Sequence, residues 1–242
     1  MTNSYVKPLI SIIIVTYNAS KYIERCLKSI LALNLDSKQL IIIDGKSTDN
    51  TLEILKTYQR DIDVLISEPD LGIYDAMNKA LRYIEGRWVY FMGADDQLLA
   101  SFNQLIPYLQ KEDSIYHGNC VTDHKKLGGF YTPYFLTKDI ICHQSILYPA
   151  IVFKKYQYQP IYPVLADYVL NMQCWGDPSL KKEYVPIDIA YYALQGYSSY
   201  TTDYKLKKDK SSLIRKYLGW KIYLRYRFRK FKAYWKGNAD TF

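Results

Sequence analysis

The sequence has few cysteines and no recurring cysteine or histidine motif. Its four cysteines, Cys26, Cys120, Cys142 and Cys174, are scattered and form no CxxC pair. This spacing indicates neither a zinc knuckle nor a disulfide framework. Free thiols are typical of a reducing compartment, so we expect a cytoplasmic protein.

Long apolar runs and the common phosphate-binding motifs are also missing. The apolar run 9–15 spans seven residues and follows a short polar N-terminus, so neither a transmembrane span nor a signal peptide is expected. No GxGxxG follows this run, and no GxxxxGK[ST] occurs in the chain. A Rossmann dinucleotide site and a P-loop are therefore both disfavoured.

The positive charge is concentrated near the C-terminus. The net charge is +8, but residues 205–236 contain 13 Lys or Arg and one acid, Asp209. The remainder carries 19 basic and 23 acidic residues. The sequence therefore predicts a mildly acidic globular body with a strongly basic tail, which bears on binding partners rather than on the fold.

Strand and helix patterns alternate through the first hundred residues. Apolar, β-branched runs predict strands at 9–16, 39–43, 63–66 and 88–92. Helical spacing predicts helices at 22–31, after Thr48 or Asp49, and at 73–84, with Ser20 as the N-cap of the first. This order predicts an α/β fold with a mostly parallel sheet and right-handed crossovers.

The pattern changes after residue 96. We expect a helix at 102–109, short strands at 114–116, 119–122 and 127–131, a helix at 166–174 and a strand at 184–193. No repeat or long linker is present, so residues 1–200 are predicted to form one domain. Within it, 8–100 is the nucleotide-binding half and 101–200 the acceptor half, and 201–242 is the basic tail.

Polar side chains, and one glycine, follow the four predicted strands. They are Thr16, Tyr17 and Asn18; Asp44, Ser47 and Asp49; Asp70, Gly72 and Asp75; and Asp95 and Asp96. The carboxyl ends of parallel strands line one crevice, where ligands bind in open α/β sheets. A carboxylate pair there can hold a divalent metal, and the metal can hold phosphates.

Each residue also has a structural alternative. Asp95 and Asp96 can cap a turn, Asp49 can cap a helix, and Asn18 can be a plain turn residue. Lys79 lies four residues after Asp75, so the two can form a surface ion pair. The ordered series of four loops is more specific than any of its members.

That series resembles family 2 glycosyltransferases, which invert the anomeric centre and have the GT-A fold. The motifs that carry the resemblance are PLISIIIVTYN at 8–18, IDGKSTDNT at 43–51, SEPDLGIYDAMNKA at 67–80 and GADD at 93–96. The likeness is close over 8–100 and looser over 115–195. It implies a Rossmann-like, mostly parallel central sheet with helices on both faces and a smaller mixed region on the acceptor side.

The resemblance also implies roles for the strand-end residues. Thr16, Tyr17, Asn18, Asp44 and Ser47 would hold the base and ribose of a nucleotide-sugar donor, most simply a UDP-sugar, and Asp70, Asp75 and Lys79 would lie near the donor sugar. In the metal motif Ala94 replaces the first acid, so Asp96 is expected to bind Mn²⁺ or Mg²⁺ and Asp95 to contact sugar or ribose.

The catalytic base of the resembled family is an acid at the start of a helix in the second half. Asp167 matches it here, with a plain N-cap as the alternative and Asp177 and Asp188 as weaker competitors. His143, followed by Gln144, is a candidate contact to the diphosphate or the acceptor, although a lone histidine is often structural.

The basic tail has helical apolar spacing. Its members are Leu213, Tyr217, Trp220, Leu224, Phe228, Phe231 and Trp235, with Lys and Arg between them. Such basic amphipathic helices are suited to an anionic membrane surface, here the inner face of the cell membrane, where a lipid-linked glycan acceptor would lie. Packing on the domain or on a second copy in a homodimer is the alternative, and no motif supports nucleic-acid binding.

We therefore expect an enzyme that moves a sugar from a nucleotide sugar to a hydroxyl of a surface-glycan acceptor. Two other functions are compatible with this fold. The first is an inactive nucleotide-sugar-binding protein of the same fold, which Ala94 alone favours. The second is a nucleotidyltransferase, which would need a Gly-rich basic loop that the sequence at 17–20 does not supply.

Overall fold

The computed structural model describes residues 7–33, 35, 37–193 and 201–236. The start of the polar N-terminal segment, the end of the tail and the stretch before the boundary predicted at residue 200 lie outside the described residues. The strands are Ile10–Thr16 (β1), Lys38–Asp44 (β2), Val64–Ser67 (β3), Trp88–Gly93 (β4), Gln97–Leu98 (β5), Ser114–Val121 (β6), Lys126–Leu127 (β7), Ile146–Pro149 (β8) and Lys181–Tyr191 (β9).

The α-helices are Ile23–Leu31 (α1), Thr51–Thr57 (α2), Ile73–Ala80 (α3), Ile151–Lys155 (α4), Ala166–Gly176 (α5), Tyr204–Leu213 (α6) and Trp220–Trp235 (α7). Shorter 3₁₀ helices span Leu81–Tyr83, Ala100–Tyr108, Phe135–Thr137 and His143–Ser145, and a π-helical turn spans Ile214–Leu218.

One sheet runs through the molecule in the order β3-β2-β1-β4-β8-β6-β9-β5, with β7 beside β6. The first four strands of this order are parallel to one another. β8 is antiparallel to both β4 and β6, so the second half of the sheet is mixed. The chain moves outward from β1 in both directions, and the carboxyl ends of β1 and β4 therefore flank a topological switch point.

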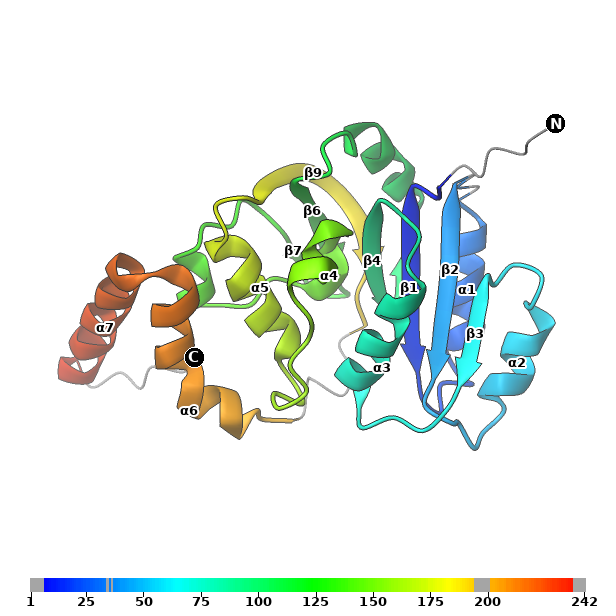
Figure 1. The fold of residues 1–242 in the computed structure, drawn as a ribbon, viewed down its shortest axis with the longest axis horizontal. Helices are drawn as coiled ribbons and strands as arrows, with labels where there is room; N and C mark the ends of the chain where they lie inside the picture. Colours follow the sequence, from blue (N-terminus) through cyan, green and yellow to red (C-terminus); the bar gives the residue numbers. More distant parts are fainter. Residues whose placement is uncertain (1–6, 34, 36, 194–200, 237–242) are drawn as a thin grey trace.

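Helices cover both faces of the sheet (Figure 1), because alternate strand residues point to opposite sides. Ile12 and Ile14 of β1 pack with α1 in one buried cluster. Ile13 and Val15 pack with α3, α4 and α5 in the other. Strands buried on both faces read as continuous apolar runs, which is why β1, β2 and β4 were recognisable in the sequence.

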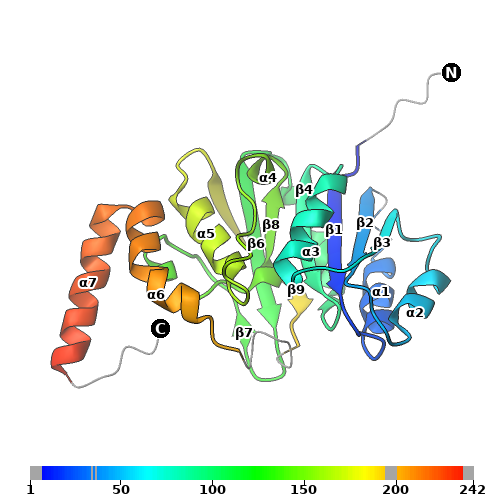
Figure 2. The same ribbon diagram turned by 60° about the horizontal axis from the view of Figure 1, so that its bottom comes forward.

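The C-terminal region lies at the end of the molecule opposite β3 and α2 in both views (Figures 1 and 2). Leu206, Leu213 and Ile214 are buried in the same cluster as α5. Gly176 at the end of α5 lies so close to the Tyr217 carbonyl that an added Cβ would approach its oxygen to 1.8 Å. The first part of the tail is thus an integral layer of the core.

Several expected elements differ in the structure. The stretch at 102–109 forms a 3₁₀ helix containing Pro107, and the two expected strands at 114–122 are one irregular strand, β6. The expected strand at 127–131 is limited to the end of β7, because Gly129 has φ of 127°. Helix α1 begins after Tyr22 without a side-chain cap, so Ser20 does not cap it.

The tail is not one continuous helix from residue 213. Gly219, with φ of 87°, separates the π-helical turn from α7. A positive φ is costly for other residues and cheap for glycine. As a result Leu213 is buried in the core, whereas the apolar side chains at Trp220, Leu224, Phe228, Phe231 and Trp235 are exposed.

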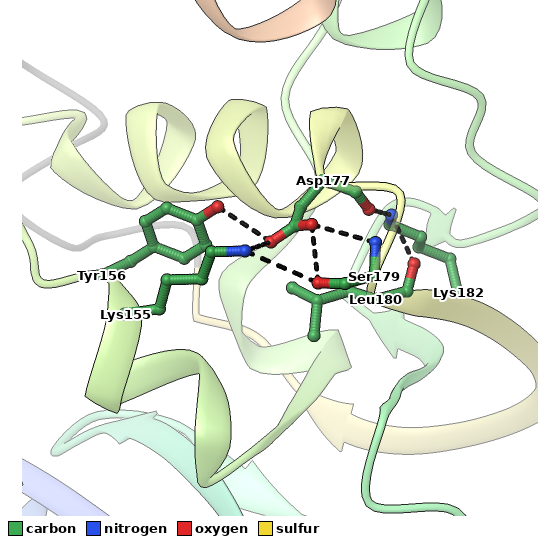
Figure 3. Close-up of polar contacts among 6 residues, drawn as sticks. All are labelled: Lys155, Tyr156, Asp177, Ser179, Leu180 and Lys182. Carbon is green, nitrogen blue, oxygen red and sulfur yellow. Dashed lines mark hydrogen bonds and ion pairs between the residues drawn. The ribbon is translucent and has the colours of Figure 1, made fainter.

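Asp177, at the C-terminal end of α5, joins three segments (Figure 3). Its carboxylate accepts hydrogen bonds from Lys155, the Tyr156 hydroxyl (2.8 Å) and the Ser179 N–H and O–H (2.9 and 2.7 Å). Burial alone would raise the pKa of Asp177, but these donors outweigh it and hold the pKa well below its usual range. Its carboxylate therefore holds the end of α5 to Tyr156 and Ser179.

We expect Asp177→Asn to lower the free energy of unfolding by about 2 kcal/mol at pH 7, since hydrogen bonds to a charged group are lost. A depressed pKa stabilises the fold above the unfolded value near 4, and this contribution is lost as the pH falls below it. The difference between variant and wild type should therefore narrow in denaturant titrations toward pH 3. Asp113→Asn, which breaks an exposed pair with Lys181, is the control and should change stability little.

Candidate active site

Two adjoining pockets lie at the switch point between β1 and β4. The first has a volume of about 650 Å³ and is lined by the loop after β1, by residues 70–76 and by Gly93, Ala94 and Asp95. The second, of about 560 Å³, lies toward the mixed half of the sheet and contains Asp167, His143 and Gln144. Val15, Ile73, Tyr74, Gly93 and Asp95 line both pockets, so the two meet at this group of residues.

The loop after β1 is fastened to the loop after β2. The Asn18 N–H donates to Ser47 Oγ (2.8 Å), and Asn18 Oδ1 accepts from the Thr48 N–H (2.9 Å). Asn18 has φ of 50°, a conformation that asparagine tolerates well. Tyr17 is left 64% exposed beside the pocket, so its ring is free to stack on a planar ligand.

Asp44 lies behind this loop and does not line either pocket. It is fully buried and accepts hydrogen bonds from the Ser47 N–H (2.9 Å) and from the hydroxyls of Ser47 and Ser67. Asp44 and Ser47 therefore organise the loop that carries Asn18. Asp49 similarly accepts from Thr51 and from the Ser20 N–H, so it joins the start of α2 to the same loop.

The segment after β3 folds over the larger pocket. Asp70 accepts from the Gly72 N–H (2.8 Å) and Asp75 from the Leu71 N–H (3.0 Å), and both aspartates line the pocket. Lys79 does not line it. Its ammonium pairs with Glu68 (3.1 Å) and Asp75 (3.3 Å) and donates to the Pro69 carbonyl, so it holds the segment in shape.

Asp95 and Asp96 occupy different environments. Asp95 is half-buried and lines both pockets, whereas Asp96 is buried and lines neither. Asp96 accepts from the Gly93 N–H, the Ala193 N–H and Gln144 Nε2. Burial and the neighbouring Asp95 carboxylate nevertheless raise the pKa of Asp96 to about 7. Burial also raises the pKa of Asp95, so the pair carries poorly compensated negative charge.

Asp167 lies in the first turn of α5, whose N-cap is Leu165, so the plain N-cap alternative is wrong. Its Oδ1 accepts hydrogen bonds from the Tyr74 hydroxyl and the Tyr168 N–H, both at 2.8 Å. In the described part of the chain Oδ2 makes no hydrogen bond, and Asp167 lines the smaller pocket. Asp188, the other competitor, is paired with Lys126 (2.8 Å) and is not in the lining.

His143 is held among aromatic rings. Its ring stacks on Phe91 at 5.3 Å between centroids, and its Nε2 lies 2.9 Å from the Tyr158 hydroxyl. Burial lowers its pKa, so the neutral imidazole is favoured. His143 thus lies in the wall of the smaller pocket, and Gln144 connects that wall to Asp96.

Tyr74 is the residue that the sequence interpretation missed. It lines both pockets, stacks on Tyr158 at 5.4 Å and donates toward Asp167 and the Val164 carbonyl. The motif at 67–80 contained it, but a tyrosine in an amphipathic helix is indistinguishable from a core residue in sequence.

Comparison with known proteins gives one matching family description. A sequence model described as Glycosyl transferase family 2 matches residues 11–169. A PGL/p-HBAD biosynthesis glycosyltransferase from Mycobacterium bovis is 34% identical over 197 residues, which are 76% of this chain and 77% of that protein. A putative teichuronic acid biosynthesis glycosyltransferase, TuaG of Bacillus subtilis, is 40% identical over 94 residues, 38% of this chain and 37% of TuaG.

Solved structures share the fold at low sequence identity. S. aureus TarS in complex with UDP-GlcNAc has a TM-score of 0.70 at 16% identity, covering 86% of this chain and 67% of that one. A mannosyltransferase from Pyrobaculum calidifontis in complex with GDP-Man and Mn²⁺ has a TM-score of 0.62 at 16% identity, covering 88% and 64%. The chain spans 38% of a longer TarS structure.

Removing the charge of Asp95 should reduce the electrostatic cost of ionising Asp96. We expect Asp95→Asn to lower the pKa of Asp96. A raised pKa costs stability as the pH rises from the unfolded value near 4 to about 7, so the variant should be more stable than wild type by about 1 kcal/mol at pH 8 in EDTA. Thermal unfolding should show this gain shrinking toward pH 4. A gain that does not depend on pH would contradict the charge explanation.

Proposed function

The chain belongs to glycosyl transferase family 2, and from this membership we propose that it transfers a sugar, with inversion, from a UDP-sugar to a hydroxyl of a glycan or lipid-linked acceptor in cell-surface polysaccharide synthesis. Its membership confirms the expected family and enzyme class, and the likeness to TarS confirms the expected GT-A fold. The observation that carries the proposal is that two pockets meet at Asp95 and Tyr74, next to Asp167.

The larger pocket suits the nucleotide of the donor. Tyr17 offers an exposed ring for the base, and Thr16, Asn18 and Asp70 supply polar groups around it. The likeness to a TarS structure that holds UDP-GlcNAc supports a UDP-sugar here. Asp44 and Ser47 would contribute indirectly, by fixing the loop that carries Asn18. A direct contact between Asp44 and the nucleobase would require Asp44 to release Ser47 or Ser67.

A divalent cation fits the chemistry of the carboxylate pair. Among the described residues no three acidic, His or Cys side chains are clustered as a complete metal site. Metals that bind nucleotides use one or two carboxylates and take further ligands from phosphate and water. Asp96, the expected metal ligand, lies behind the pocket, so we propose that it would hold Mn²⁺ or Mg²⁺ together with Asp95, which was expected to contact sugar or ribose and which lines the pocket. The poorly compensated charge of the pair suits a cation. When bound, the metal neutralises charge on the departing diphosphate.

In the proposed reaction, Asp167 takes the proton of the acceptor hydroxyl. That oxygen attacks the anomeric carbon as the bond from this carbon to the diphosphate breaks on the opposite face, which inverts the centre. Tyr74 and the Tyr168 N–H occupy Oδ1 of Asp167, so Oδ2 is the oxygen left to receive the proton. Tyr74 is therefore a positioning residue at the junction of donor and acceptor.

We expect Asp167→Asn to lower the rate of sugar transfer at least ~100-fold, because the amide cannot accept the proton. The affinity for UDP should be unchanged, since Asp167 does not line the larger pocket. Transfer is measured by UDP release and UDP affinity by calorimetry. Asp113→Asn, which breaks an exposed pair with Lys181 and lies outside both pockets, is the matched control and should retain transfer. Full transfer by Asp167→Asn would place the base elsewhere.

The exposed side of α7 supports a further part of the proposal, that the protein binds the anionic inner face of the cell membrane. Among the described residues no helix is long and apolar enough to cross a bilayer. Trp220, Leu224, Phe228, Phe231 and Trp235 are 54–75% exposed, although they recur at helical spacing. Tyr226, on the other side of the helix, is buried against the core. The helix has six Lys or Arg and no acid, which suits a negatively charged surface.

We expect Leu224→Ser with Phe228→Ser to weaken binding to vesicles rich in phosphatidylglycerol at least about tenfold, because two large apolar side chains no longer enter the interface. Co-sedimentation measures binding, and Tyr204→Ser, which alters a 79% exposed residue of α6, is the matched control. Unchanged vesicle binding would reject the membrane surface. If the double variant instead loses a homodimer in ultracentrifugation, the exposed apolar side chains of α7 contact a second copy of the chain.

A further inference from the structure

The pocket that contains Asp167 has an apolar wall on the side away from the donor pocket. The wall comes from one segment, residues 127–141, which contributes Leu127, Tyr131, Phe135, Ile140 and Ile141 to the lining. Met77, Val164 and Leu165 line the same pocket. A volume of about 560 Å³ is in the range of small-molecule sites, which are mostly apolar with a few placed polar groups.

The backbone of this wall is held from behind by hydrogen bonds. The indole N–H of Trp175 donates to the Tyr131 carbonyl (2.8 Å), and the Tyr168 hydroxyl donates to the Leu136 carbonyl. From α7, the Arg229 guanidinium donates to the Thr137 carbonyl (2.8 Å). Leu136 and Ile141 are fully buried. A rigid wall lowers the cost of ordering on binding.

A second contact from α7 supports the same segment. The Arg225 guanidinium lies 3.8 Å from the centre of the Tyr134 ring, a cation–π distance. Tyr134 directly precedes the short helix Phe135–Thr137, which carries Phe135 of the wall. The side of α7 that carries Arg225 and Arg229 therefore holds the wall segment, residues 127–141, in place.

The charges of this pocket disfavour an anionic group. Asp95, Asp139 and Asp167 line it, and Lys126 is the one lysine that the described part of the chain contributes to the lining. The Lys126 ammonium is 2.8 Å from the Asp188 carboxylate, so its charge is already matched. A carboxylate or phosphate beside the wall would meet the acids Asp139 and Asp167, and among the described residues of the lining no other lysine or arginine could pair with it.

We propose that this wall is an acceptor subsite for an uncharged apolar group, aryl or alkyl, adjoining the hydroxyl that attacks. The inference rests on the proposed function, in which Asp167 receives the proton of that hydroxyl. It narrows the acceptor class to amphiphilic alcohols, whose apolar part lies along Phe135 and Ile140 while the hydroxyl faces Asp167.

The test compares acceptor probes that share one sugar. Binding of methyl, butyl, phenyl and 4-carboxyphenyl β-glucoside to the full chain with UDP is measured by calorimetry. Butyl and phenyl glucosides should bind at least about tenfold more tightly than methyl glucoside, because each buried methylene strengthens binding roughly fourfold. The 4-carboxyphenyl glucoside should bind more weakly than the phenyl compound.

Variants locate the effect. Ile140→Ser and Leu127→Ser should remove most of the preference for the apolar aglycone, and Phe130→Ser should keep it. Phe130 belongs to the same segment but is 69% exposed and outside the lining. Equal affinity for methyl and phenyl glucosides, or a preference that survives Ile140→Ser, would overturn the subsite.

Transfer assays with the same probes separate this inference from the function on which it rests. A UDP-sugar consumed equally with methyl and phenyl glucosides would leave the transferase standing and refute the subsite. Apolar binding that depends on Ile140, without consumption of any UDP-sugar, would support the subsite and refute the proposed donor.

Discussion

The parallel pairing of β1 with β4 is the constraint on which the site depends. Their register places Val15 beside Gly93, so the loop that holds Asn18 and the turn that holds Asp95 start from neighbouring points. Neither strand could shift by one residue without turning its apolar side chains to the opposite face of a sheet that is buried on both. The positions of the two pockets are thus consequences of core packing, in which β1 contributes to both clusters.

The electrostatic cost of the site is concentrated at the same turn. Asp95 and Asp96 are adjacent in the chain, and burial makes their charges expensive. The three N–H donors around Asp96 offset part of this cost, and Gln144 ties that compensation to the wall of the smaller pocket. Buried carboxylates with raised pKa values are typical of functional sites, where a ligand can compensate the charge.

The sequence predicted the first half of the fold well because β1, β2 and β4 are buried on both faces and therefore read as apolar runs. The strand-end residues followed from topology, since parallel strands bring their carboxyl ends together. The mixed half of the sheet was harder to predict from the sequence. β8 and α4 were not predicted, because strands of four residues and helices of five carry too few positions for a periodic pattern. The separate environments of Asp95 and Asp96, and the link from Tyr74 to Asp167, depend on tertiary contacts that no local pattern encodes.

Asp203 gives the basic tail a thermodynamic connection to the site. Its carboxylate caps α6 through the Leu206 N–H and also accepts from the N–H groups of Val164 and Leu165, just before Asp167. Any free energy that ordering of the tail contributes to the segment before α5 is returned by that segment to the tail, because coupling between sites is reciprocal. Binding at α6 or α7 that favours these contacts would also favour the position of the segment that precedes Asp167. Occupancy of the smaller pocket, in turn, would appear as slower hydrogen exchange at the far end of the molecule.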